Sequence, residues 1–304
     1  MKTSLKDYFQ LHFIIILWGF TAILGLLIKI PAYHLVFYRT LLATCGILAI
    51  ILIGNFTFRV GRKDFFNLIG TGIMISAHWI LFFESARVST ASVSLAGLST
   101  ISFWTSLLEP IMKGKKIELL EVMLGILVIG GLYLIFHFEF GYAIGMLMSL
   151  SSAFLGALFT VINSKITHRH NEYVITFYEM MAANITTGLF IVIYSITISS
   201  TNNIFILPSP MDWFYLALLA FVCTVYPFSV SIELMKRITA FLMNLSVNLE
   251  PVYGILLAIL IFGDKEKMNA GFYAGTFIIL LSVIIYPLLR KRQDRRMARK
   301  GLVG

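Results

Sequence analysis

Ten apolar runs of about 20 residues each follow one another along the chain, and they decide what it can fold into. A helix of that length crosses the hydrocarbon core of a bilayer, which is about 30 Å thick. The connections between runs are short and polar, so no soluble domain fits between them. We therefore predict an all-α integral membrane protein with ten transmembrane helices. The runs are Leu11–Ile28, His34–Ile53, Phe65–Glu84, Ala91–Met112, Leu119–His137, Phe140–Ser164, Tyr173–Ile198, Asp212–Leu234, Ile238–Phe262 and Asn269–Arg290.

The composition excludes an ordinary water-soluble fold. Hydrophobic residues make up 59% of the 304 positions and charged residues only 13%, whereas a soluble domain has about 45–50% and about 25%. The two cysteines, Cys45 and Cys223, lie in apolar runs and offer neither a disulfide framework nor a metal motif. The sequence therefore indicates no cofactor and no metal. Because the first run has no small-residue cleavage site, we read it as an uncleaved helix rather than a signal peptide.

The net charge of +9 comes from basic residues in loops and in the tail. With the N-terminus inside, the inner segments and the tail hold 19 of the 24 Lys and Arg residues, the outer loops hold 4, and Arg39 lies within a span. Cytoplasmic loops are enriched in Lys and Arg, so this distribution predicts an even number of spans with both termini cytoplasmic. A nucleic-acid partner is not needed to explain the charge. The basic tail, residues 291–304, is a candidate for contact with anionic lipid.

The two halves of the chain resemble each other. The segment Phe20–Gly25 aligns with Ser151–Gly156, Phe37-Tyr38 with Phe177-Tyr178, Thr90-Ala91 with Thr239-Ala240, and Gly114 with Gly263. Each half contains five runs, and an odd number means that the second half enters the membrane from the opposite side. Inverted repeats of this kind are common in secondary transporters, with the substrate site between the halves. We place the first repeat at residues 1–138 and the second at 139–290.

Several motifs resemble the EamA-type family of the drug/metabolite transporter superfamily. They are Trp18-Gly19, Pro31 followed by Arg39, and Val247–Gly254 together with Phe262-Gly263-Asp264. The resemblance implies ten helices in two inverted five-helix repeats and export of amino acids or other metabolites. The chain departs from that family after the fourth and ninth spans, where a frequent Gly-Glu pair is replaced by Gly114-Lys115 and Gly263-Asp264.

Glu250 is the first candidate for the transport path, because ionisable groups inside a bilayer are costly and rare. It lies about halfway along the ninth run and precedes Pro251, which removes a backbone donor and favours a kink or opening of the helix. On a continuous helix, Ser246, Glu250 and Tyr253 share one face, and the two asparagines Asn244 and Asn248 lie roughly opposite. Either face could line the path, while the other bonds a neighbouring helix.

His78 and Trp79 in the third run form the second candidate pair. Histidine exchanges a proton near neutral pH, and tryptophan offers a flat apolar wall to an organic substrate. Trp18 and Asn163 complete the set of expected path-lining residues. The alternative for His78 is an ordinary hydrogen bond between helices. We consider Glu250 and His78 as candidate coupling groups.

Arg39 and Glu179 occupy equivalent positions in the two repeats, which raises the question of an ion pair between them. Their depths in the two spans place them roughly 13 Å apart along the membrane normal. We therefore expect no direct pair, and assign each a structural role or a place in its own vestibule; Pro251 is likewise assigned a structural role.

The resulting hypothesis is a secondary transporter of small metabolites in a bacterial cytoplasmic (inner) membrane. An intramembrane enzyme is disfavoured because the sequence contains no HExxH motif and no acidic cluster for phosphate chemistry. A receptor or scaffold without transport, and a carrier of phosphorylated or lipid-like substrates, are the alternatives. The oligomeric state and the coupling ion are left open.

Overall fold

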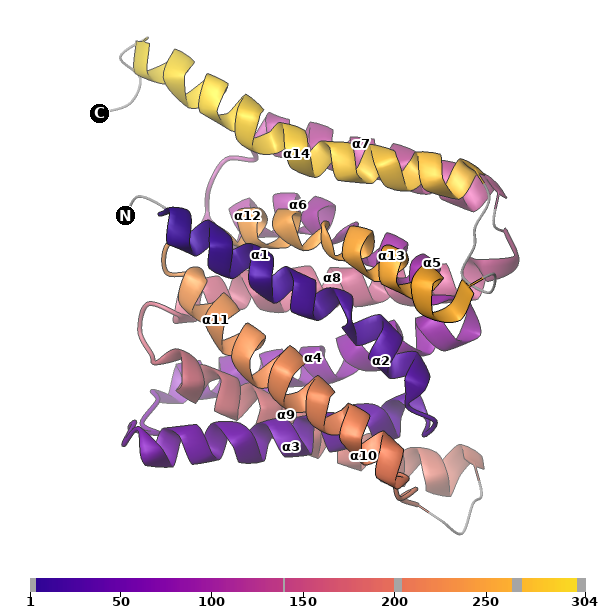
Figure 1. Ribbon diagram of the computed structural model, residues 1–304. Coiled ribbons are helices and arrows are strands. Elements are labelled where there is room, and N and C mark those ends of the chain that lie inside the picture. Colours follow the sequence, from indigo (N-terminus) through magenta and orange to yellow (C-terminus); the bar gives the residue numbers. More distant parts are fainter. Residues whose placement is uncertain (1–3, 139, 200–203, 264–269, 300–304) are drawn as a thin grey trace.

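The computed structural model describes residues 4–138, 140–199, 204–263 and 270–299, and every regular element in that region of the chain is a helix. The helices lie roughly alongside one another (Figure 1), and the start of α1 and the end of α14 lie on the same side. The α-helices are α1 (Leu5–Gly19), α2 (Thr21–Leu27), α3 (Ala32–Ile53), α4 (Arg62–Val88), α5 (Ala91–Leu98), α6 (Ile101–Lys113), α7 (Leu119–Phe138), α8 (Ala143–Ile166), α9 (Glu172–Tyr194), α10 (Pro210–Ala217), α11 (Tyr226–Leu234), α12 (Ala240–Val247), α13 (Glu250–Phe262) and α14 (Ala270–Arg299).

Seven helical segments of the described chain are long and apolar enough to cross a membrane. They are Leu5–Leu27, Ala32–Ile53, Arg62–Val88, Ala91–Lys113, Ala143–Ile166, Glu172–Thr197 and Pro210–Leu234. Large apolar side chains point outward from these helices, among them Ile53, 82% exposed, and Phe214, 57% exposed. Such an exterior requires lipid rather than water around it. The chain is therefore a multi-pass membrane protein.

The other three expected runs also form helix, but differently. The run Ile238–Phe262 is interrupted and forms α12 and α13. The fifth and tenth runs form α7 and α14, whose apolar stretches are shorter. The helix α14 continues to Arg299, so residues 291–299 of the basic tail extend the last helix rather than leaving it. The outer-loop lysines Lys265 and Lys267 lie outside the described residues.

Three of the expected spans are broken near their middle. The break between α1 and α2 is at Phe20, that between α5 and α6 is at Ser99–Thr100, and that between α12 and α13 is at Asn248–Leu249. At the second break the hydroxyls of Ser99 and Thr100 donate to the carbonyls of Ala96 and Gly97, local bonds that compete with the helical ladder. At the third, Pro251 is in the first turn of α13 and has no N–H to continue the ladder from α12.

The second and third breaks occupy equivalent positions in the two halves. The two breaks are separated by 149 positions in the sequence, and the helix caps before them are separated by the same number. Thr90 accepts a hydrogen bond from the Val93 amide, and Thr239 accepts one from the Leu242 amide. The glycines that end the two spans, Gly114 and Gly263, both have positive φ. The repeat seen in the sequence therefore extends to local backbone conformation.

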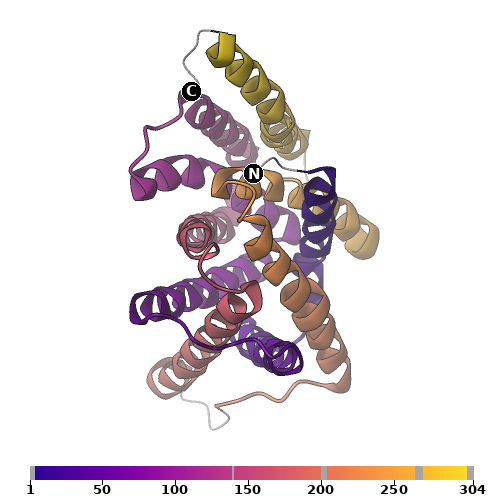
Figure 2. The same cartoon turned by 90° about the vertical axis from the view of Figure 1, so that its left-hand side faces the viewer.

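The packing of the bundle brings the two halves together. α4 packs against α8 and α9, α3 packs against α9, and α5 and α6 both pack against α8. α5 also packs against α13, and α6 against α12, so the two broken spans run antiparallel (Figure 1). α7 and α14 lie side by side at one edge of the bundle (Figure 2). The interior between the halves is where a shared site can form.

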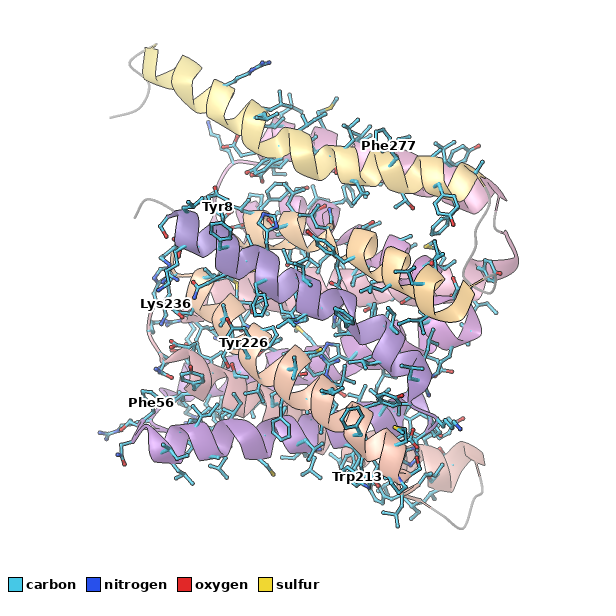
Figure 3. The ribbon with its side chains drawn as sticks, in the orientation of Figure 1. Tyr8, Phe56, Trp213, Tyr226, Lys236 and Phe277 are labelled. Carbon is cyan, nitrogen blue, oxygen red and sulfur yellow. The ribbon has the colours of Figure 1, made fainter. Side chains whose placement is uncertain are left out.

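Ion pairs gather at the end of the bundle where α1 begins. Arg237 Nε lies 2.8 Å from a carboxylate oxygen of Asp7, and Lys236 Nζ lies 2.7 Å from one of Glu172. Figure 3 places Lys236, Tyr8 and Phe56 toward this end and Trp213 toward the other. Aromatic residues near both ends are typical of membrane–water interfaces.

Candidate functional site

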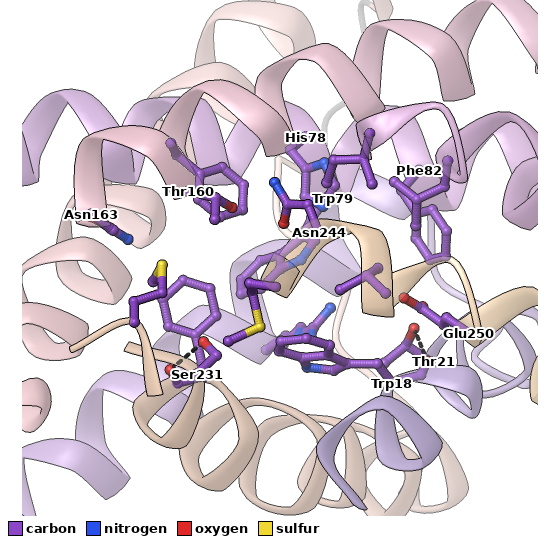
Figure 4. A pocket seen from close by; sticks show the side chains of 18 residues that line it. Trp18, Thr21, His78, Trp79, Phe82, Thr160, Asn163, Ser231, Asn244 and Glu250 are labelled. Carbon is purple, nitrogen blue, oxygen red and sulfur yellow. Dashed lines mark hydrogen bonds between the residues drawn. The ribbon is translucent and has the colours of Figure 1, made fainter. Parts of the chain in front are cut away.

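A central cavity of about 90 Å³ lies between the two halves of the chain (Figure 4). Helices α1 to α6 supply the wall on one side, and α8, α11, α12 and α13 supply it on the other. A space of about 10–15 Å³ already holds one water, so this cavity has room for several waters or for a small ligand. Its wall consists of Trp18, Thr21, Arg39, His78, Trp79, Phe82, Leu98, Ile101, Phe159, Thr160, Asn163, Phe228, Ser231, Met235, Met243, Asn244, Val247 and Glu250.

Glu250 reaches the cavity because the ninth span is broken. It is the first residue of α13 and is only 4% exposed. A helix N-terminus favours a negative charge at that position. The Arg39 guanidinium and the Thr21 hydroxyl interact with it, and that hydroxyl donates to the carbonyl of Trp18 at 2.6 Å.

Arg39 is a buried cation in the opposite wall, with 2% of its surface exposed. Its Nε donates to Oγ1 of Thr224 at 2.7 Å, and its guanidinium carbon lies 3.8 Å from the centroid of the Trp79 ring. Thr224 belongs to a π-helical segment, Leu218–Val225, and its own hydroxyl donates to the Leu219 carbonyl five residues earlier. π-Helical turns inside α-helices are frequent at functional sites. Here the turn presents an acceptor that holds the guanidinium against the indole.

The His78 side chain packs against α8. Its Nδ1 lies 2.8 Å from both the carbonyl oxygen and Oγ of Ser152, and the Ser152 hydroxyl lies 2.8 Å from the His78 carbonyl. Gly156 permits this approach, because a Cβ there would lie 3.3 Å from Cε1 of the imidazole and 2.8 Å from Cδ1 of Ile101. The imidazole is therefore fixed by packing and hydrogen bonds while one edge lines the cavity.

Two asparagines bring amides to the wall from the second half. Asn244 donates from Nδ2 to Oγ1 of Thr105 at 2.8 Å and is 2% exposed. Asn163, three residues before the end of α8, is 1% exposed, and its Oδ1 has no hydrogen-bond partner within the described region of the chain. The wall thus offers aromatic surface, one guanidinium, one carboxyl, one imidazole and two amides. The described residues contain no group of three or more His, Cys, Asp or Glu that could hold a metal ion.

The structure brings six of the eight expected path-lining residues into one wall: Trp18, His78, Trp79, Asn163, Asn244 and Glu250. Asn248 is elsewhere, since its Nδ2 donates to Oγ of Ser102 at 2.8 Å and it is fully buried. Tyr253 is also outside the wall, where its Cβ lies 3.0 Å from a Cβ built on Gly19.

The expectation that Asn244 and Glu250 lie on opposite faces is wrong for a physical reason. It assumed a continuous helix, whereas the break at Asn248–Leu249 lets both residues face the same cavity.

Arg39 lies in the cavity wall, so the expectation of a vestibule or purely structural position does not describe it. Glu179 lies behind the wall and is fully buried. The two do not form an ion pair among the described residues. The side chain of Pro251 lies outside the described portion of the chain.

The sequence did not identify the other wall residues, which are Thr21, Phe82, Leu98, Ile101, Phe159, Thr160, Phe228, Ser231, Met235, Met243 and Val247. The apolar residues among them carry no signal that separates a cavity wall from a helix interface.

Comparison with known proteins connects this arrangement to a family. Residues 8–137 and 143–286 each match the sequence model of the EamA-like transporter family. No curated protein sequence matches the chain significantly. A crystal structure of another protein aligns with a TM-score of 0.72 at 15% sequence identity, over 96% of this chain and 100% of that one. At that identity the alignment shows a shared fold.

Proposed function

Because this chain belongs to the EamA-like transporter family, we propose that it exports amino acids or closely related small metabolites. Export would proceed by alternating access at the interface between the two halves. The observation that carries the proposal is the central cavity, whose wall combines side chains of opposite charge from both halves. Transporters built from repeats bind their substrates at this interface, near the middle of the membrane.

Ten membrane-spanning helices in two inverted five-helix repeats, at residues 1–138 and 139–290, form the proposed architecture. The equivalent breaks, threonine caps and glycine ends of the two halves support the repeat. The antiparallel course of α5–α6 and α12–α13 supports the inversion. In an inverted repeat, rocking of one half against the other opens the cavity alternately to each side.

The charges in the cavity favour a zwitterionic substrate. The Arg39 guanidinium suits a carboxylate, because its planar array of donors matches carboxylate geometry. The Glu250 carboxyl and the amide oxygen of Asn244 suit an ammonium group. Phosphorylated substrates generally need several cations, and Arg39 is the single Lys or Arg side chain in the wall of this cavity.

The indole rings of Trp18 and Trp79 offer aromatic surfaces to the apolar portion of a substrate. The cavity volume of about 90 Å³ is small beside the roughly 300–1,000 Å³ of pockets for drug-sized ligands, which favours a small metabolite. We assign proton coupling to Glu250 or His78, because both titratable groups line the cavity.

The proposed location is a bacterial cytoplasmic membrane with both termini in the cytoplasm. The basic residues of the inner segments support this orientation, and the described ends of the chain lie on one side of the bundle. The basic tail then faces anionic lipid headgroups. A reporter enzyme that is active only in the cytoplasm, fused to residue 304, would be active; inactivity would reverse the orientation.

The metabolite content of the medium around cells that overproduce the protein tests the proposal. Wild type should enrich at least one amino acid or related compound outside the cell, and Glu250→Ala made in equal amount should not. Equal enrichment by both would remove Glu250 from the substrate path. No enrichment by wild type, at a confirmed membrane level, would contradict export and favour a receptor.

A further inference from the structure

Glu179 is a second buried carboxyl group, separate from the wall of the cavity. It lies on α9 and has no exposed surface. Neither of its carboxyl oxygens has a hydrogen-bond partner among the described residues. An ionised carboxylate buried in such a place, with no cation beside it, is strongly unfavourable. A carboxyl in this position takes up a proton instead.

The neighbours of this carboxyl are Thr71 on α4 and Asn163 on α8. The Thr71 hydroxyl donates to the carbonyl of Leu68 at 3.0 Å. The Asn163 amide carries both N–H donors and an acceptor, Oδ1, and this oxygen has no partner among the described residues. The protonated acid has an O–H to donate, and the free Oδ1 of Asn163 can accept it.

Close helix packing seals the site on the side of α4. A Cβ on Gly72 would lie 2.6 Å from the backbone oxygen of Glu179 and 2.5 Å from Cβ of Ala182. The backbones of α4 and α9 are therefore in close contact beside Glu179. The other neighbour, Asn163, lines the central cavity. Asn163 therefore joins the sealed carboxyl to the cavity.

The charged groups on the surrounding helices are engaged elsewhere. On α4, Asp64 pairs with Arg169 and His170, at 3.0 and 2.8 Å, while His78 is bound to Ser152. The α3 cation, Arg39, bonds Thr224 and faces Glu250 rather than Glu179.

The helices α8, α9 and α11 have their charged groups near one end. Glu172 of α9 pairs with Lys236, and Glu233 of α11 pairs with Arg237. Lys165 of α8 donates to the Met112 carbonyl. The remaining titratable groups of these helices have other surroundings. Arg62, Lys63, Tyr226 and Cys45 are exposed, and Glu84 is partly exposed. Arg87 donates to the carbonyls of Gly25 and Ile28, Tyr38 to that of Ile206, and Tyr178 to that of Phe58. His34 contacts the Ile204 carbonyl, Tyr33 lies against Tyr194 at a tilted angle, and Tyr173 stacks on Phe56.

We propose that Glu179 is a proton-binding site behind the cavity, loaded from the cavity past Asn163. The carboxylate takes up one proton that reaches it from solution through the cavity, and becomes a neutral acid that donates to Thr71 or Asn163. Under the proposed function Glu179 is a coupling group in addition to Glu250 or His78, and the release of its proton accompanies one reorientation of the two halves. The proton binding itself does not depend on the proposed function.

Infrared spectra of the full-length protein in lipid vesicles test the site without a known substrate. At neutral pH, wild type should show the carbonyl band of a protonated carboxylic acid, and Glu179→Gln should lack a portion of it. Glu109→Gln is the matched control, because Glu109 is also buried but accepts hydrogen bonds from Lys113 and from the Phe241 amide, both at 2.7 Å. Because this carboxyl is ion-paired with Lys113, its removal should leave the band unchanged. A band of equal intensity in wild type and Glu179→Gln would overturn the proposal.

Asn163→Ala provides a second variant in case Glu179→Gln does not fold. It keeps the acid and removes one acceptor, so the band should remain and shift in frequency. An unchanged frequency would contradict contact with Asn163. The spectra are recorded in potassium and in sodium buffers at one pH. Loss of the band in sodium alone would show that Glu179 binds sodium rather than a proton, and would overturn the proposal.

Transport measurements separate this proposal from the proposed function. If wild type transports and Glu179→Gln loses the dependence of flux on a pH gradient, proton coupling at Glu179 is supported. If the infrared band belongs to Glu179 but the variant keeps the pH-gradient dependence, the coupling role is overturned. A wild type that shows the Glu179 band without transporting any metabolite contradicts the proposed function and leaves proton binding supported.

Discussion

The guanidinium carbon of Arg39, on α3, lies 3.8 Å from the centroid of the Trp79 ring on α4. The contact places a cation and an aromatic surface side by side in the wall of the cavity. A second ring, that of Phe83, lies 5.6 Å from the same carbon. Arginine stacks on aromatic faces more readily than lysine does, because its guanidinium is planar and weakly hydrated. The stack therefore keeps a cation in the wall where a carboxylate of the substrate can reach it.

Arg39→Lys should raise KM for the exported compound while the protein still reaches the membrane. Lysine keeps the charge but loses the planar stack and the bond to Thr224. A cation–π contact contributes about 0.5–2 kcal/mol, which corresponds to an increase of about 2- to 30-fold in KM. Initial export rates at several internal concentrations of the exported compound measure this KM. Arg87→Lys, which alters an arginine outside the cavity wall, is the control, and an equal rise in that variant would contradict the role of Arg39.

Glu109→Ala should destabilise the fold, since Glu109 on α6 accepts a hydrogen bond from the Phe241 amide near the start of α12. Removing the carboxyl leaves that buried donor unpaired, at a cost of about 1–3 kcal/mol. Thermal unfolding of purified protein in one detergent would show a lower midpoint. Lys113→Met removes only the ion-pair partner of Glu109, 21% exposed, and should cost less than about 1 kcal/mol. Equal shifts in both variants would show that the bond to α12 contributes little.

Gly156→Val should reduce export, because the new side chain would displace His78 or Ile101 from the cavity wall. Overpacking of this kind costs about 1–3 kcal/mol. Gly70→Val is the matched control, since a Cβ on Gly70 would meet no atom within 4 Å. Export rate per molecule of protein in the membrane distinguishes the two. Normal export by Gly156→Val would mean that the position of His78 does not matter.

Much of the architecture follows from apolar patterning alone. The runs His34–Ile53 and Phe65–Glu84 lie within α3 and α4, and the start of the run Ala91–Met112 coincides with the start of α5. A long apolar run must form helix in lipid, because its backbone groups have no other partners. The breaks inside spans were harder to predict. Ser99 and Thr100 interrupt an apolar run through local side-chain bonds, which hydropathy does not register.

The site was predictable where chemistry was unusual for a membrane. Glu250, His78, Asn163 and Asn244 stand out in the sequence because polar groups are rare in spans. Helical periodicity then misassigned Asn244 relative to Glu250, because it could not include the turn at Asn248–Leu249. The depth of Arg39 along its helix predicted a vestibule or structural position. Its side chain lies in the cavity wall instead, held there by a hydrogen bond to Thr224. Thr224 lies on a π-helical turn that sequence periodicity does not reveal.

Counterflow in lipid vesicles tests the central claim most directly, namely that the cavity carries a small zwitterion across the membrane. Vesicles containing the purified protein are preloaded with an unlabelled amino acid that was enriched by export, and uptake of the labelled form is followed. We expect transient accumulation with wild type and none with Glu250→Ala or with empty vesicles. Absence of counterflow with wild type, for every amino acid and related compound enriched by export, would contradict the account.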